Sequence, residues 1–184
     1  MPHKSPPSTI KITSGTLRRR TIKVPPNHNT THPMGARERL ALFNTIAPLG
    51  TPSSVLDAFA GSGALGIEAL SRGAKHAVFV ESDHTAANTL RENLKALDLP
   101  DITSVLEKPV EKLSLKGRYA LIIADPPYDH YDPQIITHLL PMVEKNGIFV
   151  LSHPHGVTPL LKGFRLLKHA SYASANLSIF QRIA

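Results

Sequence analysis

The sequence predicts a doubly wound α/β domain with a mainly parallel sheet, and three observations support this fold class. Short apolar runs alternate with helical patterns along most of the 184 residues, as strands and helices do in such domains. No polar linker divides the chain, which indicates a single core. The last two predicted strands follow each other without a helix between them, which predicts one antiparallel edge strand.

Three parts are predicted along the chain. Several prolines near the start predict a disordered tail at 1–8. Alternation of apolar and polar residues then predicts a basic N-terminal β-hairpin extension at 9–35, and the α/β domain occupies 36–184. The alternating apolar residues of the hairpin are Ile10, Ile12, Ile22 and Val24.

Apolar periodicity places the helices and strands of the domain. Ala87, Leu90, Leu94 and Leu97 lie on one helical face, and Asn146-Gly147 is predicted to stop the last helix. Helices are predicted at 36–46, 64–72, 85–97 and 133–144. Strands are predicted at 54–59, 77–81, 103–106, 119–124, 148–151, 164–171 and 176–182.

Basic residues are concentrated at the amino-terminal end of the chain. Residues 1–50 contain eight Lys or Arg and one acid, a net charge of +7, while the remaining residues contain thirteen of each sign. The first quarter therefore carries the whole formal charge, which indicates a polyanionic partner. The candidate contacts to this partner are Arg18, Arg19, Arg20, Lys23, Arg37 and Arg39.

A glycine-rich segment joins the predicted strand at 54–59 to the helix at 64–72. Gly61, Gly63 and Gly66 allow the backbone to approach a ligand closely, and the start of the helix presents free N–H groups. The spacing is also that of G-x-G-x-x-G, which nicotinamide and flavin dinucleotide sites share. The segment therefore predicts a cofactor loop.

Two carboxylates favour a different cofactor from a dinucleotide. Asp57 ends a strand four residues before Gly61, where a negative charge opposes a pyrophosphate and favours the sulfonium and ammonium groups of S-adenosylmethionine. Glu81 ends the next strand, where a carboxylate can bind a ribose diol. Ser82 and Asp83 are expected to flank the adenine. The predicted cofactor contacts are Asp57, Phe59, Gly61, Gly63, Glu81, Ser82 and Asp125.

The stretch Asp125-Pro126-Pro127-Tyr128 follows an apolar strand and has the residues for an acceptor site. Proline holds φ at about −65° and has no N–H, so the carbonyls of Asp125 and Pro126 can point rigidly at a ligand. Fixed oxygen acceptors beside the Tyr128 ring suit a planar base that carries an exocyclic amino group. We therefore predict a nucleobase acceptor, with Asp125, Pro126 and Tyr128 as the catalytic residues.

Composition excludes several other classes of site. The chain has no cysteine, so it has neither disulfides nor thiolate metal sites. The ten histidines show no metal-ligand pattern, and His153 and His155 are expected to lie in a polar loop rather than to bind a metal. No run of eighteen apolar residues and no hydrophobic leader occurs, so the expected location is the cytoplasm, away from membranes.

Residues 55–74, 78–81 and 125–128 together resemble the bacterial 16S rRNA guanine-N2 methyltransferases of the RsmD type. The similarity extends to the opening hairpin of that family at 12–20 and to its first helix at 37–44, so it covers nearly the whole chain. It implies a Rossmann-like methyltransferase fold with a seven-stranded-type sheet. It also implies methyl transfer from S-adenosylmethionine to N2 of a guanine by direct in-line displacement. The implied partner is 16S rRNA or the assembling small ribosomal subunit, bound by a monomer without a metal.

The chain departs from that family at three places. Residues 34–40 replace much of an Arg-Pro-Thr-x-x-x-Arg-x-Arg-Glu pattern, although Arg37 and Arg39 remain. Lys108 stands where relatives tend to carry Asp or Asn for the adenine amino group, so it is assigned no cofactor role. Ala173-Ser174 replaces the Tyr-Gly that commonly precedes the last strand.

Two alternative functions stay open. A DNA or RNA adenine-N6 methyltransferase uses similar chemistry and often Asp-Pro-Pro-Tyr, although reading a DNA sequence usually requires a recognition domain for which this chain has no spare residues. A catalytically silent RNA-binding or ribosome-assembly protein that kept the fold is an alternative of another class.

Overall fold

The computed structural model describes residues 9–26, 34–114, 117–127, 131–157, 159–172 and 175–184. Its helices are α1 (Ala36–Ile46), α2 (Ala64–Ser71), α3 (His84–Ala96) and α4 (Pro133–Leu139). Its strands are β1 (Thr9–Lys11), β2 (Thr21–Lys23), β3 (Ser54–Asp57), β4 (His76–Glu81), β5 (Thr103–Glu107), β6 (Tyr119–Ala124), β7 (Val143–His153), β8 (Phe164–Ser171) and β9 (Asn176–Arg182). The predicted tail at 1–8, Tyr128 and Ala173-Ser174 lie outside the described residues.

Seven strands form one sheet in the order β5-β4-β3-β6-β7-β9-β8. The strands from β5 to β7 in this order pair in parallel, and β9 pairs antiparallel with both of its neighbours. The predicted doubly wound, mainly parallel sheet is therefore confirmed. Helices cover both faces, since apolar residues of α1, α2 and α3 pack on one face and those of α4 pack on the other.

The position predicted for the antiparallel strand is wrong, because β9 lies between β7 and β8 and the edge strand is β8. Burial explains this order. The first five residues of β9 are buried, whereas most of β8 is half-buried or exposed and carries Arg165 and Lys168. The more apolar strand occupies the interior of the sheet, and the basic strand protects its edge against further pairing.

The last predicted helix is too long. Pro141 follows α4 in a 3₁₀ turn, Leu140–Met142, and β7 begins directly afterwards at Val143. A proline has no N–H to continue a helix, so α4 ends before it. Asn146-Gly147, predicted to stop a helix, instead lies in an irregular part of β7, where Tyr119 pairs with Val143 but Leu121 pairs with Ile148.

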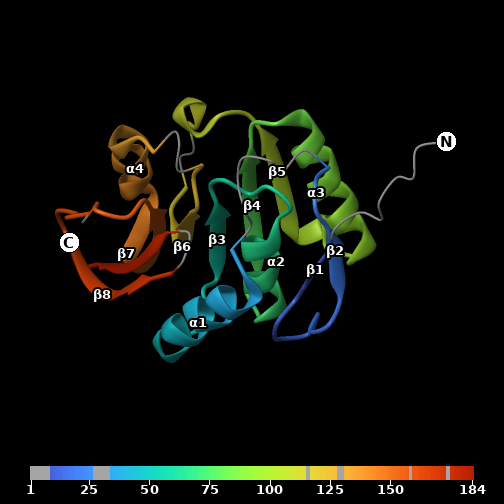
Figure 1. Cartoon of the computed structure of the whole chain (residues 1–184), viewed down its shortest axis with the longest axis horizontal. Helices are drawn as coiled ribbons and strands as arrows, with labels where there is room; N and C mark the ends of the chain where they lie inside the picture. Colours follow the sequence, from blue (N-terminus) through green and yellow to red (C-terminus); the bar gives the residue numbers. More distant parts are fainter. Residues whose placement is uncertain (1–8, 27–33, 115–116, 128–130, 158, 173–174) are drawn as a thin grey trace.

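The amino-terminal residues form the predicted hairpin, with Ile10 opposite Ile22 in an antiparallel pair. In Figure 1 the hairpin lies beside α3, at the opposite end of the molecule from β8. Ile12 and Ile22 are buried in the core that the first three helices share. The hairpin is therefore packed against the domain.

Hydrogen bonds attach the hairpin to α2. The Glu68 carboxylate is 0% exposed and accepts bonds from the Thr13 amide, the Thr13 hydroxyl and the Ser14 amide. It also pairs with Arg72, which lies one turn later in the chain. Buried carboxylates are tolerated when they are paired and hydrogen-bonded, so the hairpin is a part of what allows Glu68 to be buried.

Gly15 marks the closest approach of the hairpin to α2, and Gly15→Ala is expected to lower the free energy of unfolding by about 2–4 kcal/mol. Its φ is +81°, and an added Cβ would overlap the backbone carbonyl of Ser71. Gly156 has a φ of +80° with open space around its Cβ, so Gly156→Ala is a matched control for backbone strain alone. Urea unfolding of both variants measures the difference, and equal losses of stability would show that the packing against Ser71 is unimportant.

Candidate cofactor and acceptor site

Three carboxylates predicted from the sequence meet at one edge of the sheet. Asp57 ends β3 and Glu81 ends β4, while Asp125 directly follows β6. The three strands are parallel neighbours, and Asp57 is level with Phe79 and Ile123. The carboxyl ends of such strands form the crevice in which ligands bind in doubly wound folds.

Asp57 is the most deeply buried of the three, with 1% of its surface exposed. Its Oδ2 accepts a hydrogen bond from the Gly66 amide at 2.9 Å, while Oδ1 has no partner among the described residues. Burial raises the pKa of Asp57 to about 7, and the negative charges of Asp125 and Glu81 add to this rise, whereas the backbone amides of Gly66 and Phe59 oppose it. A ligand that brings a positive charge and an N–H donor would relieve both the repulsion and the unmet acceptor.

Glu81 connects two loops at the same edge. Its Oε2 accepts a bond from the Gly61 amide at 2.8 Å, and its Oε1 accepts one from the Asp83 amide at 2.8 Å. The carboxylate thus lies directly between the glycine loop and the start of α3. Each of its oxygens keeps a second lone pair with which it can accept a ligand hydroxyl.

The glycine loop follows β3 and leads into α2. Gly61 has a φ of 51° and Gly63 a φ of 84°, a region that glycine adopts without a steric penalty. Asn93, which was given no role from the sequence, lies in α3 and donates from its side chain to the Ser62 carbonyl at 3.0 Å. Its spacing could have indicated that Asn93 is buried, because it lies on the same helical face as Leu90 and Leu94.

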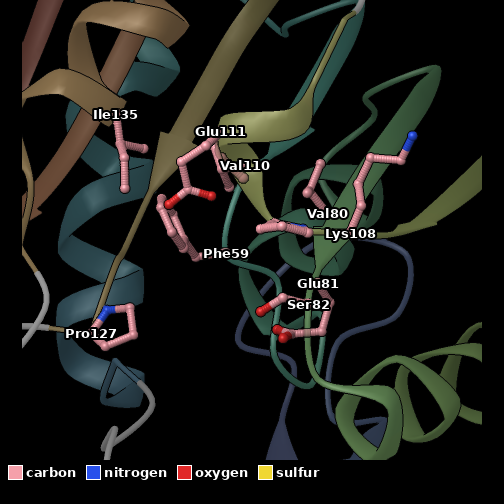
Figure 2. Close-up of a pocket in the computed structure, with 11 residues that line it drawn as sticks. Phe59, Val80, Glu81, Ser82, Lys108, Val110, Glu111, Pro127 and Ile135 are labelled. Atoms are coloured by element: carbon pink, nitrogen blue, oxygen red, sulfur yellow. The ribbon is translucent and has the colours of Figure 1, made fainter.

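A cavity of about 170 Å³ opens beside these residues. Four of its lining residues belong to the predicted motifs, namely Phe59, Glu81, Ser82 and Pro127. Figure 2 shows them together with Val80, Lys108, Val110, Glu111 and Ile135, which sequence analysis did not assign to the site. A largely apolar lining with a few polar groups is typical of a small-molecule site.

The acceptor motif lies next to this cavity. Asp125 is half-buried, Pro126 is buried and Pro127 lines the cavity. Tyr128, the predicted stacking residue, lies outside the described residues. The described part of the motif therefore places the Asp125 carboxylate and two prolines next to this cavity.

The predicted polyanion contacts fall into two groups. Arg18, Arg19, Arg20 and Lys23 are exposed on the hairpin, and Arg37 is exposed at the start of α1. Arg39 differs from them, because it is 2% exposed and its guanidinium donates to the carbonyls of Met34 and Lys11. Burial lowers the pKa of Arg39, and the charges of Glu68 and Glu38 oppose that change. Arg39 therefore joins α1 to β1 and is too buried to meet a phosphate directly.

His153 is also placed differently from the prediction, since it is the last residue of β7 and is buried rather than lying in a loop. Its ring contacts the Ser178 hydroxyl and the Pro154 carbonyl, and burial lowers its pKa. In the described part of the chain, no group of three His, Cys, Asp or Glu residues could hold a metal ion. No helix there is long and apolar enough to cross a membrane.

Comparison with known proteins relates the chain to methyltransferases. The solved structure of yhhF from Escherichia coli superposes with a TM-score of 0.84 at 28% identity, over 96% of this chain and 99% of that chain. Ribosomal RNA small subunit methyltransferase D of Escherichia coli K12 is 34% identical over 147 residues, which are 79% of this chain and 72% of the relative. A tRNA1(Val) (adenine(37)-N6)-methyltransferase of Shewanella putrefaciens is 32% identical over 92 residues, 48% of this chain and 39% of the relative.

The strand order, the glycine loop and the acidic strand ends define a Rossmann-like methyltransferase. The sequence model described as Conserved hypothetical protein 95 matches residues 10–181. The chain belongs to this family of S-adenosylmethionine-dependent methyltransferases.

Proposed function

We propose that the protein transfers a methyl group from S-adenosylmethionine to the N2 amino group of a guanine in 16S rRNA. The observation that carries the proposal is the buried carboxyl of Asp57 beside the Asp125-Pro126 acceptor motif, because its Oδ1 has no partner among the described residues and a cationic methyl donor would stabilise its ionised form, which burial disfavours. The similarity to a small-subunit rRNA methyltransferase supports the choice of RNA. We further propose that the protein acts in the cytoplasm as a monomer, on 16S rRNA or on the assembling small ribosomal subunit.

The residues of the cleft have separate proposed roles. Asp57, Glu81 and Ser82 would bind the cofactor with Phe59 and the glycine loop, and the bound cofactor supplies an electrophilic methyl group. The amino lone pair of guanine is delocalised into its ring and is therefore a poor nucleophile. Asp125 and the Pro126 carbonyl would accept hydrogen bonds from its N–H groups and direct the lone pair out of the ring plane. The N–C bond would form as the methyl–sulfur bond breaks, which leaves S-adenosylhomocysteine, and the Asp125 carboxylate would take the proton that the nitrogen loses. Tyr128 would stack on the extruded base.

Positioning is expected to supply most of the rate enhancement. A hydrogen bond to a charged group contributes about 1.5–3 kcal/mol, whereas holding two reactants in attack geometry supplies about 7–11 kcal/mol. No side chain needs to form a covalent bond with the substrate, because the acceptor attacks the methyl group directly. The cleft therefore has to orient two ligands rather than to provide a nucleophile.

Methyl transfer from labelled cofactor to small-subunit rRNA, or to particles that lack the modification, tests the proposal. The expected product is N2-methylguanosine at one position, and mass spectrometry of rRNA from cells with and without the protein identifies it. N6-methyladenosine would instead favour the adenine-N6 activity, which the partial match to the tRNA1(Val) enzyme supports. Binding of RNA without any transfer would favour a ribosome-assembly protein.

The exposed hairpin arginines are expected to make RNA affinity depend on salt. Replacing Arg18, Arg19 and Arg20 with alanine should reduce the slope of log K against log salt by roughly 0.7–0.9 for each phosphate that the variant no longer neutralises. Lys145→Ala, Lys162→Ala and Arg165→Ala together remove the same charge from exposed positions away from the hairpin and serve as the control. An unchanged slope in the hairpin variant would exclude these arginines from the interface.

A further inference from the structure

Asn93 joins the basic hairpin to the glycine loop. Its side chain lies in α3 and is 3% exposed. Oδ1 accepts a bond from the Lys23 amide at 2.8 Å, and Nδ2 donates to the Lys23 carbonyl at 2.9 Å and to the Ser62 carbonyl at 3.0 Å. Both donors of the amide nitrogen are therefore used, one for each of the two segments.

On the hairpin side, the Asn93 side chain provides the hydrogen bonds that a neighbouring strand would otherwise make with the free edge of β2. One edge of β2 pairs with β1, and both backbone groups of Lys23 bond the Asn93 side chain. Further contacts reach the same helix, since Lys23 Nζ pairs with Glu92 at 2.9 Å and Arg20 donates to the Ala96 carbonyl. These outer contacts are exposed and therefore weak, so the buried amide is the firmest polar link between β2 and α3, in addition to the apolar packing of Ile22.

On the cofactor side, three side chains hold the glycine loop in place. Glu81 accepts from the Gly61 amide, Asp57 accepts from the Gly66 amide, and Asn93 donates to the Ser62 carbonyl. The loop contains two glycines with positive φ, and glycine has the largest conformational freedom to lose. Asn93 is the one of these three side chains that also bonds the hairpin.

We propose that Asn93 is a positioning residue through which RNA on the hairpin and the cofactor on the glycine loop bind cooperatively. RNA that contacts Arg20 and Lys23 would further restrict the motion of β2 on α3, and a cofactor would further restrict that of the loop around Ser62. Because one buried amide holds both segments, restricting either segment also restricts the other, so the second ligand has less conformational entropy to lose. The inference rests on the proposed function, because it requires RNA and the methyl donor as the two ligands.

The affinity of S-adenosylhomocysteine, measured by calorimetry with and without a 16S rRNA transcript at one fixed salt concentration, tests the coupling. In the unmodified protein RNA should tighten this affinity at least about fivefold, the lower end of typical coupling. Asn93→Asp keeps the shape and the acceptor of the side chain but removes both N–H donors. The ratio of the affinity with RNA to the affinity without RNA should therefore fall to about one. A variant that keeps the full ratio would overturn the proposal.

Asn88→Asp is the matched control. It makes the same substitution on the same helix, but Asn88 is exposed and bonds His84 and Arg91 rather than the hairpin or the loop. This control should keep the ratio of the unmodified protein. A control that loses the ratio equally would assign the effect to added charge on α3 and would overturn the role of Asn93.

Hydrogen exchange in the unmodified protein provides a test that does not depend on folding of the variant. S-adenosylhomocysteine alone, without RNA, should slow exchange of the Lys23 amide, which is bonded to Asn93. No slowing at saturating ligand would refute the coupling. Independent binding of both ligands would also refute the coupling but leave the proposed function intact, whereas failure to bind either ligand would refute both.

Discussion

Asp125→Ala is expected to lower the rate of methyl transfer by roughly 10²- to 10³-fold, the usual effect of removing a preorganised hydrogen-bonding group from a reaction centre. In the proposed mechanism the Asp125 carboxylate accepts from the amino group that is methylated, and it acts most strongly when that nitrogen begins to bond the methyl carbon. Cofactor affinity should change only a few-fold, because Asp57 and Glu81 remain in the cleft. Single-turnover rates and calorimetry measure the two effects separately.

Asp101→Ala provides the control for Asp125→Ala. Asp101 is exposed in a 3₁₀ turn before β5, at the amino end of that strand and away from the cleft. Its replacement should leave both the rate and the affinity unchanged. If Asp125→Ala weakened cofactor binding strongly and left the rate at saturating cofactor intact, Asp125 would be a cofactor ligand and the acceptor site would have to be sought elsewhere.

Asp57→Asn is expected to weaken cofactor binding by roughly 10- to 100-fold at pH 8, because a hydrogen bond to a charged group contributes about 1.5–3 kcal/mol. Asparagine keeps an acceptor for the Gly66 amide but carries no charge to attract a cation. The methyl-transfer rate at saturating cofactor should change much less. A loss confined to that rate would contradict the assignment of Asp57 to cofactor binding.

The pKa of Asp57 also predicts how cofactor affinity depends on pH. Burial raises this pKa to about 7, so the carboxyl is largely protonated at pH 6 and largely ionised at pH 8. A cationic ligand prefers the ionised form. Affinity should therefore fall up to about tenfold for each pH unit below 7, and this dependence should be absent in Asp57→Asn. Calorimetry of both proteins at pH 6, 7 and 8 isolates the contribution of Asp57 from that of the histidines.

Asp57→Asn should also stabilise the protein in the absence of its ligand. An unfolded aspartate has a pKa of about 3.9, so between pH 4 and 7 the folded protein binds more protons at Asp57 than the unfolded chain does. The contribution of Asp57 to the free energy of unfolding therefore decreases as pH rises through this range. At pH 8 Asp57→Asn should raise that free energy by roughly 1–3 kcal/mol in urea unfolding, as is common when a destabilised functional group is removed.

The acidic residues at the ends of the central strands could be predicted from the sequence because local patterns determine them, although β3 ends at Asp57, two residues before its predicted end. The apolar run before Asp57 and the glycines after it define a strand, a turn and a helix without any knowledge of distant contacts. The position of β9 could not be predicted in this way, since strand order depends on which strand packs better against β7. In the structure residues 176–180 of β9 are buried, whereas the basic strand β8 is half-buried or exposed.

Two polar residues on apolar helical faces differed most from expectation, since Arg39 was assigned to the polyanion surface and Asn93 was given no role. Arg39 lies at helical spacing from Leu42, Phe43 and Ile46, which is the buried face of α1. Asn93 occupies the equivalent face of α3. Charge and residue type alone suggested a surface role for Arg39, but a polar side chain within an apolar stripe is usually buried with its hydrogen bonds satisfied. The Arg39 guanidinium donates to the carbonyl of Met34, five residues earlier, and to that of Lys11, which is distant in the sequence and which no local pattern identifies, while its Nε has no partner among the described residues.

The buried Glu68 limits where this chain can be shortened. If the chain began at Ala36, α2 would keep a carboxylate in its interior with Arg72 as a partner but without the donors from Thr13 and Ser14. Leaving a buried charge incompletely paired destabilises a protein by several kcal/mol. The hairpin is thus an integral part of the hydrophobic core and of its polar interior, and the catalytic domain and the surface proposed to bind RNA fold as one unit.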